Sequence, residues 1–341
     1  MTFENVPSEN ESAAAIASTT AIPPAATTVT TASLKTTATT EVDPAFEIYL
    51  RDKPGLTYVD DGDSWLRRQV TQSVEVLLGR RRLERHYFAL KARNLEPLAF
   101  FREAQKVSGI ALEGTVLADT VLADTLLADT LLESSVPSLQ HIKHEGPLLF
   151  LANHPFGILD GLILCNLVAE LAGDFRVVIN SLLCQDRDLA PYFLPIDFAG
   201  TREAERRNIR TKQLAGDALN DGIPLILFPS GTVSTATHRG FGPVKDTHWT
   251  TFAAKLVLRY QPTIVPVFFH GQNSRAFHIA SHIAEPLRMA MLMHEALRRF
   301  NTTIHVDVGE ALEPTAYEHL QDRQTLTGFL YERVQATGSG C

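Results

Sequence analysis

Short runs of apolar residues alternate with longer amphipathic stretches throughout the second half of the chain. The apolar runs are PLLFLA, FRVVIN, PLILFP, TIVPVFF and IHVDVG, at residues 147–152, 175–180, 224–229, 263–269 and 304–309. Helical periodicity covers residues near 159–172, 201–220, 246–259, 287–300 and 314–335. Buried strands that alternate with helices predict an α/β fold with a mainly parallel central sheet flanked by helices. In such sheets ligands bind beyond the carboxyl ends of the strands.

The rest of the chain divides into segments of different composition. Residues 1–43 are dominated by Ser, Thr, Ala and Pro, and predict a disordered low-complexity tail because they offer little apolar surface to bury. Residues 44–114 predict an N-terminal helical region. Residues 115–135 hold the repeats VLADT, VLADT and LLADT, which we interpret as a surface insert. Residues 136–337 then form the α/β domain, and residues 338–341 a flexible C-terminus.

The stretch from Trp65 to Arg93 is basic, with eight Lys and Arg residues against Glu75 and Glu84. Its apolar residues fall at helical spacing. Two interpretations stay open. The stretch is either a solvated helical hairpin that packs on the main domain, or an interfacial helix that faces anionic lipid.

Composition narrows the function classes. The chain has 31 Lys and Arg against 39 Asp and Glu, a formal charge of −8, which argues against a general nucleic-acid binder. Three cysteines are too few for a disulfide framework or a four-thiolate metal site, and favour a reducing compartment. No apolar run reaches the roughly 18 residues that cross a bilayer. The first residues, MTFENVPSENES, lack the basic character of a signal peptide, so we expect a cytoplasmic chain.

A histidine and an aspartate follow the first strand of the predicted sheet. The sequence there is Asn153-His154-Pro155-Phe156-Gly157-Ile158-Leu159-Asp160-Gly161. An aspartate at a helix start can hold an imidazole in one tautomer and make it an oriented general base. An N-capping Asp beside an unrelated loop histidine explains the same spacing. No G-x-S-x-G motif is present, so the proton removed would belong to a bound hydroxyl rather than to a protein serine.

Three blocks together resemble the glycerolipid (PlsC-type) acyltransferase superfamily. They are NHPFGILDG after the first strand, FPSGTVS at 228–234 and IVPVFFHGQNSR at 264–275. They are most similar to a bacterial hemolysin-like branch related to the O-acyltransferases of ornithine-lipid synthesis. The resemblance implies that residues 136–337 are an acyltransferase domain in which His154 and Asp160 are the catalytic dyad.

The same resemblance implies the substrates. The donor would be acyl-CoA or an acyl carrier protein, acting as substrate, with no further cofactor and no metal. The acceptor would be a lysolipid, reached at the inner face of the cell membrane by a peripherally associated enzyme. Backbone N–H groups around Gly231 and Thr232 are candidates for stabilising the oxyanion. The predicted substrate-binding residues are Arg202, Phe228, Pro229, Ser230, Gly231, Thr232, Asn273 and Arg275.

The sequence departs from the superfamily pattern at two points. Five residues separate His154 from Asp160 where the usual spacing has four, with Pro155 and Gly157 available to absorb the extra one. Ser230 stands where glycerol-phosphate enzymes have Glu, which argues against glycerol 3-phosphate or its monoacyl form as acceptor. Arg202, after the Gly200-Thr201 turn, is the residue we expect to contact an acceptor phosphate.

Other residues allow other chemistry. His278 and His282 are four apart, but the following Pro286 disfavours the helix that zinc ligation needs. Cys165 is interpreted as core. Cys184 could line a pocket, with an inert thiol favoured over a nucleophile. Two other functions stay open: a non-catalytic lipid-binding or hemolysin-like protein, and an acyl thioesterase that uses water as acceptor.

Overall fold

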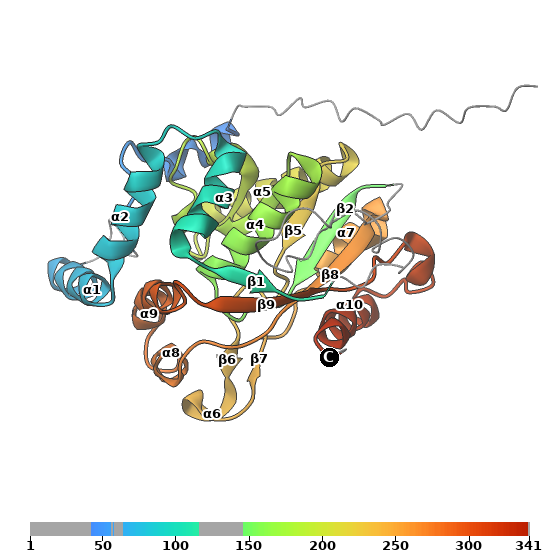
Figure 1. Cartoon of the computed structure of the whole chain (residues 1–341). Helices are drawn as coiled ribbons and strands as arrows, with labels where there is room; N and C mark the ends of the chain where they lie inside the picture. The colour runs from blue at the N-terminus through green and yellow to red at the C-terminus, as the bar shows by residue number, and fades with distance from the viewer. Residues whose placement is uncertain (1–41, 56, 58–63, 116–145, 340–341) are drawn as a thin grey trace, which may run out of the picture. The chain divides into compact units, whose positions relative to one another are not determined.

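The computed structural model describes residues 42–55, 57, 64–115 and 146–339 (Figure 1). Residues 1–41 of the predicted tail, the pentapeptide repeats and the last two residues lie outside these ranges, whereas residues 42 and 43 lie within them. Among the described helices, none is both long enough and apolar enough to cross a membrane.

The described chain is built on a seven-stranded sheet of order β1-β9-β8-β2-β5-β3-β4. Every neighbouring pair is parallel except β8 and β9. The prediction of a mainly parallel sheet is therefore confirmed. The strands are β1 (Ala111–Glu113), β2 (Leu148–Ala152), β3 (Arg176–Asn180), β4 (Phe193–Ile196), β5 (Leu225–Leu227), β8 (Thr263–Phe269) and β9 (Thr303–Val308).

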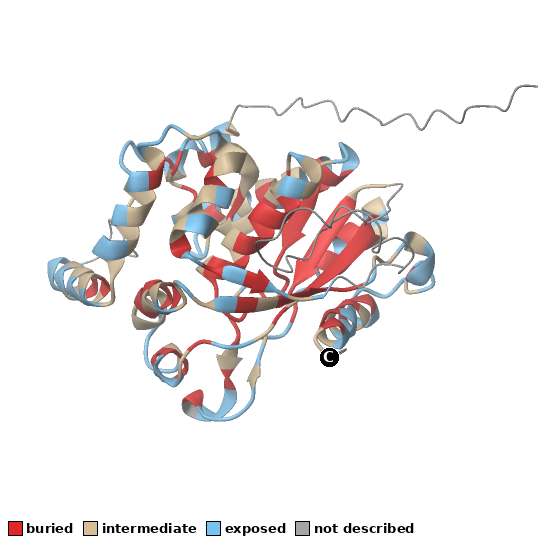
Figure 2. Ribbon diagram, viewed as in Figure 1, coloured by how far each residue is buried: buried red, intermediate tan, exposed pale blue. Residues whose placement is uncertain are grey.

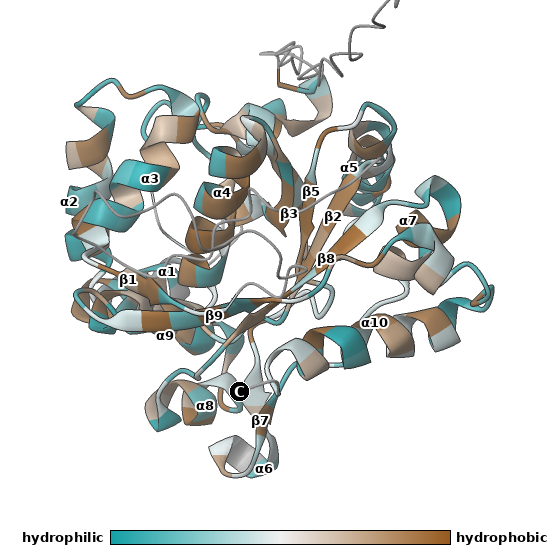
Figure 3. Ribbon diagram, turned by 45° about the vertical axis from the view of Figure 1, so that its right-hand side comes forward, coloured by the Kyte–Doolittle hydropathy of each residue, from teal (hydrophilic) through white to brown (hydrophobic). Residues whose placement is uncertain are grey.

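Helices cover both faces of this sheet, which is why its central strands are apolar throughout (Figures 2 and 3). In β2, Phe150 packs into the core under α3 and α4, whereas Leu149 and Leu151 pack into the core on the other face. One face carries α3 (Pro97–Ser108), α4 (Ile158–Ala172) and α9 (Glu285–Arg298), and the other carries α5 (Arg202–Asn220), α7 (Phe252–Tyr260) and α10 (Arg323–Thr337).

The N-terminal region forms short helices that pack on the α/β domain. A 3-10 helix, η1 (Pro44–Tyr49), contacts α5, and α1 (Trp65–Leu77) and α2 (Arg80–Lys91) contact α9. Gly79 joins α1 to α2 with φ of 105°, and a Cβ there would lie 2.5 Å from Leu297 Cδ1. The basic stretch is therefore a helical hairpin that packs on the main domain, and contact of its exposed side with anionic lipid stays a prediction. The region also contributes β1, so its last residues belong to the central sheet.

The sequence missed the smallest elements and misplaced two helix starts. A hairpin of β6 (Thr235–Ala236) and β7 (Val244–Lys245) encloses α6 (Thr237–Gly240), and α8 (Arg275–Ser281) packs beside it. Helix α7 begins later than predicted because the residues before it form a loop that supports the site. The final helix was expected from 314, but η5 (Pro314–Ala316) precedes α10, whose N-cap Asp322 accepts a hydrogen bond from Thr325 N–H at 2.7 Å.

Two further 3-10 helices, η3 (Ser181–Leu183) and η4 (Ala190–Tyr192), lie between β3 and β4.

Candidate active site

His154 and Asp160 meet at the carboxyl end of β2, in the middle of the sheet. His154 follows the strand by two residues, and Asp160 lies in the first turn of α4. His154 Nδ1 is 3.0 Å from Asp160 Oδ2, and the Asp160 side chain is fully buried. The angle at Nδ1 falls short of a regular hydrogen bond in this structure.

The extra residue between the pair is absorbed at Gly157. Its φ of 85° and ψ of −107° let the loop curl around the carboxylate. The backbone N–H groups of Phe156 and Gly157 donate to Asp160 Oδ2 at 2.8 and 2.9 Å. A Cβ on Gly157 would approach Val233 Cγ2 to 3.0 Å and Leu292 Cδ2 to 3.1 Å. The conformation of Gly157 therefore lets His154 and Asp160 stay in contact despite the extra residue between them.

Burial and hydrogen bonding act on Asp160 in opposite directions. Burial raises the pKa of its carboxyl above the ordinary value, and the His154 ring and the two backbone N–H groups oppose that rise. These are also the groups that stabilise an imidazolium and a carboxylate side by side. The pair can thus hold a proton that arrives on His154.

Asn153 fixes the strand end that carries His154. Its side-chain amide donates to the Phe269 carbonyl at 2.9 Å and accepts from the Phe269 N–H at 2.7 Å. Gly271 lets the next loop pass close by, because a Cβ there would lie 2.8 Å from Phe156 Cζ. The ends of β2 and β8 are therefore locked together beneath the dyad.

Asp246 supports the same loop from the other side, and no motif in the sequence points to it. One oxygen accepts from the backbone N–H of His154 at 3.2 Å and from the Ser234 hydroxyl. The other accepts from Trp249 Nε1 at 3.0 Å. The Ser234 N–H in turn donates to the His154 carbonyl at 2.8 Å. Asp246 and Ser234 thus hold the backbone N–H and the backbone carbonyl of His154, respectively.

A cavity of about 560 Å³ extends from His154 between α4 and the strands β3 and β4. This is the size of a typical small-molecule site. The Phe228 ring stacks near His154 with centroids 4.3 Å apart. Apolar side chains form most of the cavity wall, among them Phe100, Phe101, Ile158, Leu162, Val177, Ile179, Leu189 and Leu292.

Three of the predicted substrate-binding residues line this cavity: Phe228, Gly231 and Thr232. Pro229 and Ser230 are buried behind them, where their carbonyls accept hydrogen bonds from Thr250 N–H and the Thr247 hydroxyl. Asn273 is buried and Arg275 is exposed at the start of α8, and neither lines the cavity.

The predicted oxyanion donors need a correction. The Gly231 N–H donates to the Phe228 carbonyl at 2.9 Å and closes a turn, in which Gly231 has φ of 66°. That group is therefore already used. Thr232 N–H donates to no other group among the described residues, and remains the candidate.

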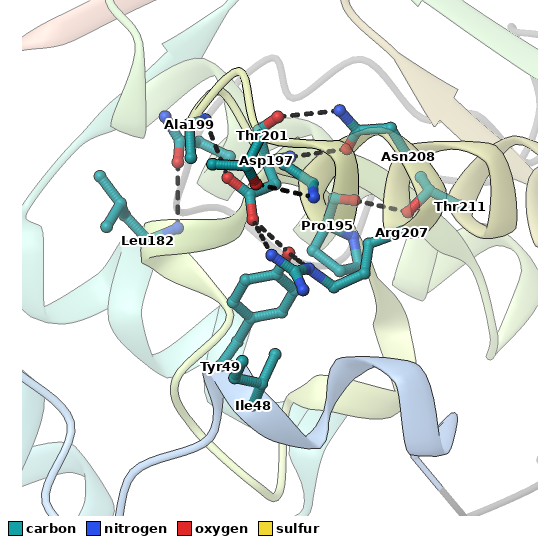
Figure 4. Close-up of polar contacts among 12 residues, drawn as sticks. Ile48, Tyr49, Leu182, Pro195, Asp197, Ala199, Thr201, Arg207, Asn208 and Thr211 are labelled. Carbon is teal, nitrogen blue, oxygen red and sulfur yellow. Dashed lines mark hydrogen bonds and ion pairs between the residues drawn. The ribbon is translucent and has the colours of Figure 1, made fainter.

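Among the arginines of α5, Arg207 lies in the polar cluster with Tyr49 and Asp197 that Figure 4 shows, and Arg202 does not reach the cavity. Arg202 is exposed and outside the cavity lining. Arg207 donates to Asp197 at 2.8 Å and to the Tyr49 hydroxyl at 2.6 Å. Arg210 pairs with Asp43 at 2.8 Å. These contacts bind η1 to α5 because the N-terminal segment brings its own acceptors to the helix.

The remaining histidines and cysteines have structural surroundings. His278 Nδ1 accepts from the Ala236 N–H at 3.3 Å, and His282 Nε2 lies 2.9 Å from the Ala236 carbonyl, so this pair holds one backbone unit. Cys165 is buried in the core, as predicted, and also borders the cavity, whereas Cys184 does not line it. Burial raises the pKa of both thiols, which keeps them protonated and unreactive.

A separate cluster joins His270, His305 and Asp307 at β8 and β9. Among the described residues these are the side chains whose ligand atoms lie close enough to share a cation. His270 Nε2 is 2.6 Å from Asp307 Oδ2, a direct hydrogen bond. Thr115 donates its N–H and hydroxyl to the same carboxylate at 2.8 and 2.7 Å. The cluster thus binds the segment after β1 to the sheet.

Known proteins resemble this chain in sequence. A family model described as acyltransferase matches residues 129–320, more than half of the chain. The lyso-glycine lipid O-acyltransferase of Phocaeicola vulgatus is 29% identical over 185 residues, 52% of this chain and 63% of that protein. The enzyme of the same name from Bacteroides thetaiotaomicron is 28% identical over 185 residues, 52% of this chain and 65% of that protein. The match thus spans less than two thirds of the length of these relatives.

Among solved structures, the 1-acyl-sn-glycerophosphate (LPA) acyltransferase PlsC from Thermotoga maritima aligns with 80% of this chain and 88% of its own. The identity is 14% and the TM-score 0.44.

The extent of the family match shows that the chain belongs to this acyltransferase family. The resemblance to acyltransferases seen in its sequence blocks is confirmed at the level of this family.

Proposed function

We propose that the protein transfers a fatty acyl group from an acyl thioester to a hydroxyl of a lysolipid. The observation that carries this proposal is the contact of His154 Nδ1 with the buried Asp160, at the end of an apolar cavity. That contact leaves Nε2 of the ring for a substrate hydroxyl. Family membership supports the reaction class.

The reaction uses one base throughout. His154 removes the proton from the acceptor hydroxyl, whose oxygen attacks the thioester carbonyl carbon to form a tetrahedral oxyanion. Thr232 N–H is the donor we assign to that oxyanion. Collapse of the intermediate breaks the C–S bond, and the departing thiolate takes the proton from His154. Asp160 stabilises the imidazolium between these two steps.

The lining of the cavity and the names of the relatives indicate which acyl donor and acceptor to expect. An apolar wall suits a fatty acyl chain, because apolar area removed from water contributes about 25 cal/mol per Å². Acyl-CoA and an acyl carrier protein are both donors of the required kind. The relatives' names point to a lyso-glycine lipid as acceptor, ahead of a lyso-ornithine lipid or a monoacylglycerol phosphate.

The helical hairpin is the surface we assign to membrane contact. Trp65 and Leu77 are 74% and 85% exposed on α1. Arg81, Arg82 and Arg85 are exposed on α2. Apolar and basic side chains on one exposed hairpin suit an anionic bilayer surface, on the inner face of the cell membrane.

Thiol release with and without acceptor tests the proposal. Purified protein is incubated with palmitoyl-CoA or palmitoyl carrier protein, with and without N-(3-hydroxypalmitoyl)glycine, and the lipid product is identified by mass spectrometry. Release that requires the acceptor, with a diacylated product, supports the transfer. Equal release without acceptor identifies a thioesterase, and no release with either donor supports a non-catalytic lipid-binding or hemolysin-like protein.

A further inference from the structure

The guanidinium of Arg288 faces the substrate cavity, and no carboxylate among the described residues pairs with it. Arg288 lies in the first turn of α9 and lines the same cavity as His154. Among the described residues that line this cavity it is the sole Lys or Arg. Its Nη2 donates to the Val233 carbonyl at 2.8 Å, and its Nε is buried without a hydrogen-bond partner.

Such a group calls for an anion. A buried cation that is not paired loses hydration without compensation, so buried arginines are normally held by carboxylates. Burial accordingly lowers the pKa of Arg288, and Glu285 opposes this. Arg298 on the same helix is paired, with Glu295 at 3.2 Å. Arg288 instead keeps donors for a bidentate contact with a carboxylate or phosphate.

Its position ties it to the reacting groups. Arg288 binds the carbonyl of Val233, and the next residue, Ser234, binds the His154 carbonyl through its N–H at 2.8 Å. One peptide unit therefore connects the guanidinium to the loop that carries the general base. The phosphates of a CoA or carrier-protein donor lie at the far end of the pantetheine arm from the thioester. The acceptor headgroup, in contrast, is joined directly to the acyl unit that bears the reacting hydroxyl.

We propose that Arg288 binds the anionic headgroup of the acceptor, and that it selects lysolipids with a free carboxylate. This inference rests on the proposed function. Arg288, rather than the exposed Arg202, is then the residue that binds the charged group of the acceptor. A phosphate offers the same anionic oxygens, so the experiment separates an acceptor carboxylate from a donor phosphate.

The experiment compares two acceptors that differ in charge alone, N-(3-hydroxypalmitoyl)glycine and its glycinamide analogue. We expect the wild type to favour the carboxylate by tenfold or more in kcat/KM. Arg288→Gln should lower kcat/KM for the carboxylate by roughly 10- to 100-fold, mainly through acceptor KM, and leave the glycinamide within about twofold. Arg288→Lys should restore part of the preference. Arg259→Gln, an exposed arginine on α7, is the matched control and should change neither acceptor.

The outcomes separate the two proposals. If the wild type acylates neither lipid, the proposed function is wrong. If it acylates both but Arg288→Gln reduces them equally, or reduces neither, the assignment of Arg288 is overturned. Repeating the assay with palmitoyl-pantetheine, which lacks phosphates, tests whether Arg288 binds a phosphate of the donor instead. A loss seen with palmitoyl-CoA that disappears with palmitoyl-pantetheine would place a donor phosphate on Arg288 and contradict the proposal.

Discussion

Asp246 accepts a hydrogen bond from the backbone N–H of His154 across 92 positions of sequence. The same carboxylate binds the Ser234 hydroxyl and Trp249 Nε1. It therefore joins the loop after β2, the loop after β5 and the loop before α7. We regard Asp246 as a positioning residue, because it acts on the general base through the backbone.

Removing that carboxylate should loosen the loop of His154. Asp246→Ala leaves the His154 N–H and Trp249 Nε1 without their acceptor, so we expect kcat to fall about 10- to 100-fold, and stability to fall by about 1–3 kcal/mol. Asp246→Asn keeps one acceptor oxygen and should restore most of kcat. Asp217→Ala, an exposed carboxylate on α5, is the control. Steady-state kinetics with urea unfolding checks this. A stability loss in Asp246→Ala with kcat unchanged would show that Asp246 has no part in positioning.

Asp160→Asn should separate activity from stability. The variant keeps an acceptor oxygen for Phe156 and Gly157 but loses the charge that stabilises the imidazolium, so kcat should fall by about 10²- to 10⁴-fold. Burial raises the Asp160 pKa in the folded protein, so the folded state binds more protons than the unfolded state and the ionised carboxylate reduces stability as pH rises. The variant should therefore be at least as stable as the wild type at pH 8.

The pH dependence of unfolding checks the sign of this effect. The stability advantage of Asp160→Asn should shrink as pH falls toward the ordinary aspartate range near 4. Urea unfolding at pH 8 and pH 5 measures it. A variant that is markedly less stable at pH 8, with activity reduced only in proportion to the folded fraction, would contradict a catalytic role for the carboxylate.

Charge reversal on α2 tests the membrane surface. Arg80 is unsuitable because it pairs with the buried Glu75 at 2.8 Å. Reversing the exposed Arg81, Arg82 and Arg85 to Glu should lower the binding constant for anionic vesicles roughly a hundredfold at low salt, since each basic residue contributes about 1 kcal/mol. Sedimentation with the vesicles measures this constant. The effect should be smaller at high salt because of screening.

The matched control for this reversal lies across the molecule. Arg259, Arg323 and Arg333 are exposed on α7 and α10, and reversing them changes the net charge equally. In Figures 1 and 3 these helices lie on the opposite side from α1. Equal weakening by both triple variants would mean that net charge, rather than the hairpin, governs binding.

The sequence predicted the central elements well and the supporting contacts poorly. β2, β5 and β8 could be found because strands buried on both faces are apolar at nearly every position. The dyad could be found because His154 and Asp160 are six positions apart and both follow the end of a predicted strand. Asp246 and Arg288 could not be found, since each acts on residues distant in sequence and has no local pattern. The hairpin of β6 and β7 is too short to show an alternation.

Acceptor-dependent release of CoA by His154→Ala tests the central claim most directly. The side chain of His154 is partly exposed, at 18%, so the variant should fold and melt like the wild type. Loss of the general base should lower turnover by about 10²- to 10⁴-fold, whereas His319→Ala, an exposed histidine, should leave it unchanged. A folded His154→Ala protein that acylates the lysolipid at a rate close to that of the wild type would contradict the assignment of His154 as the base.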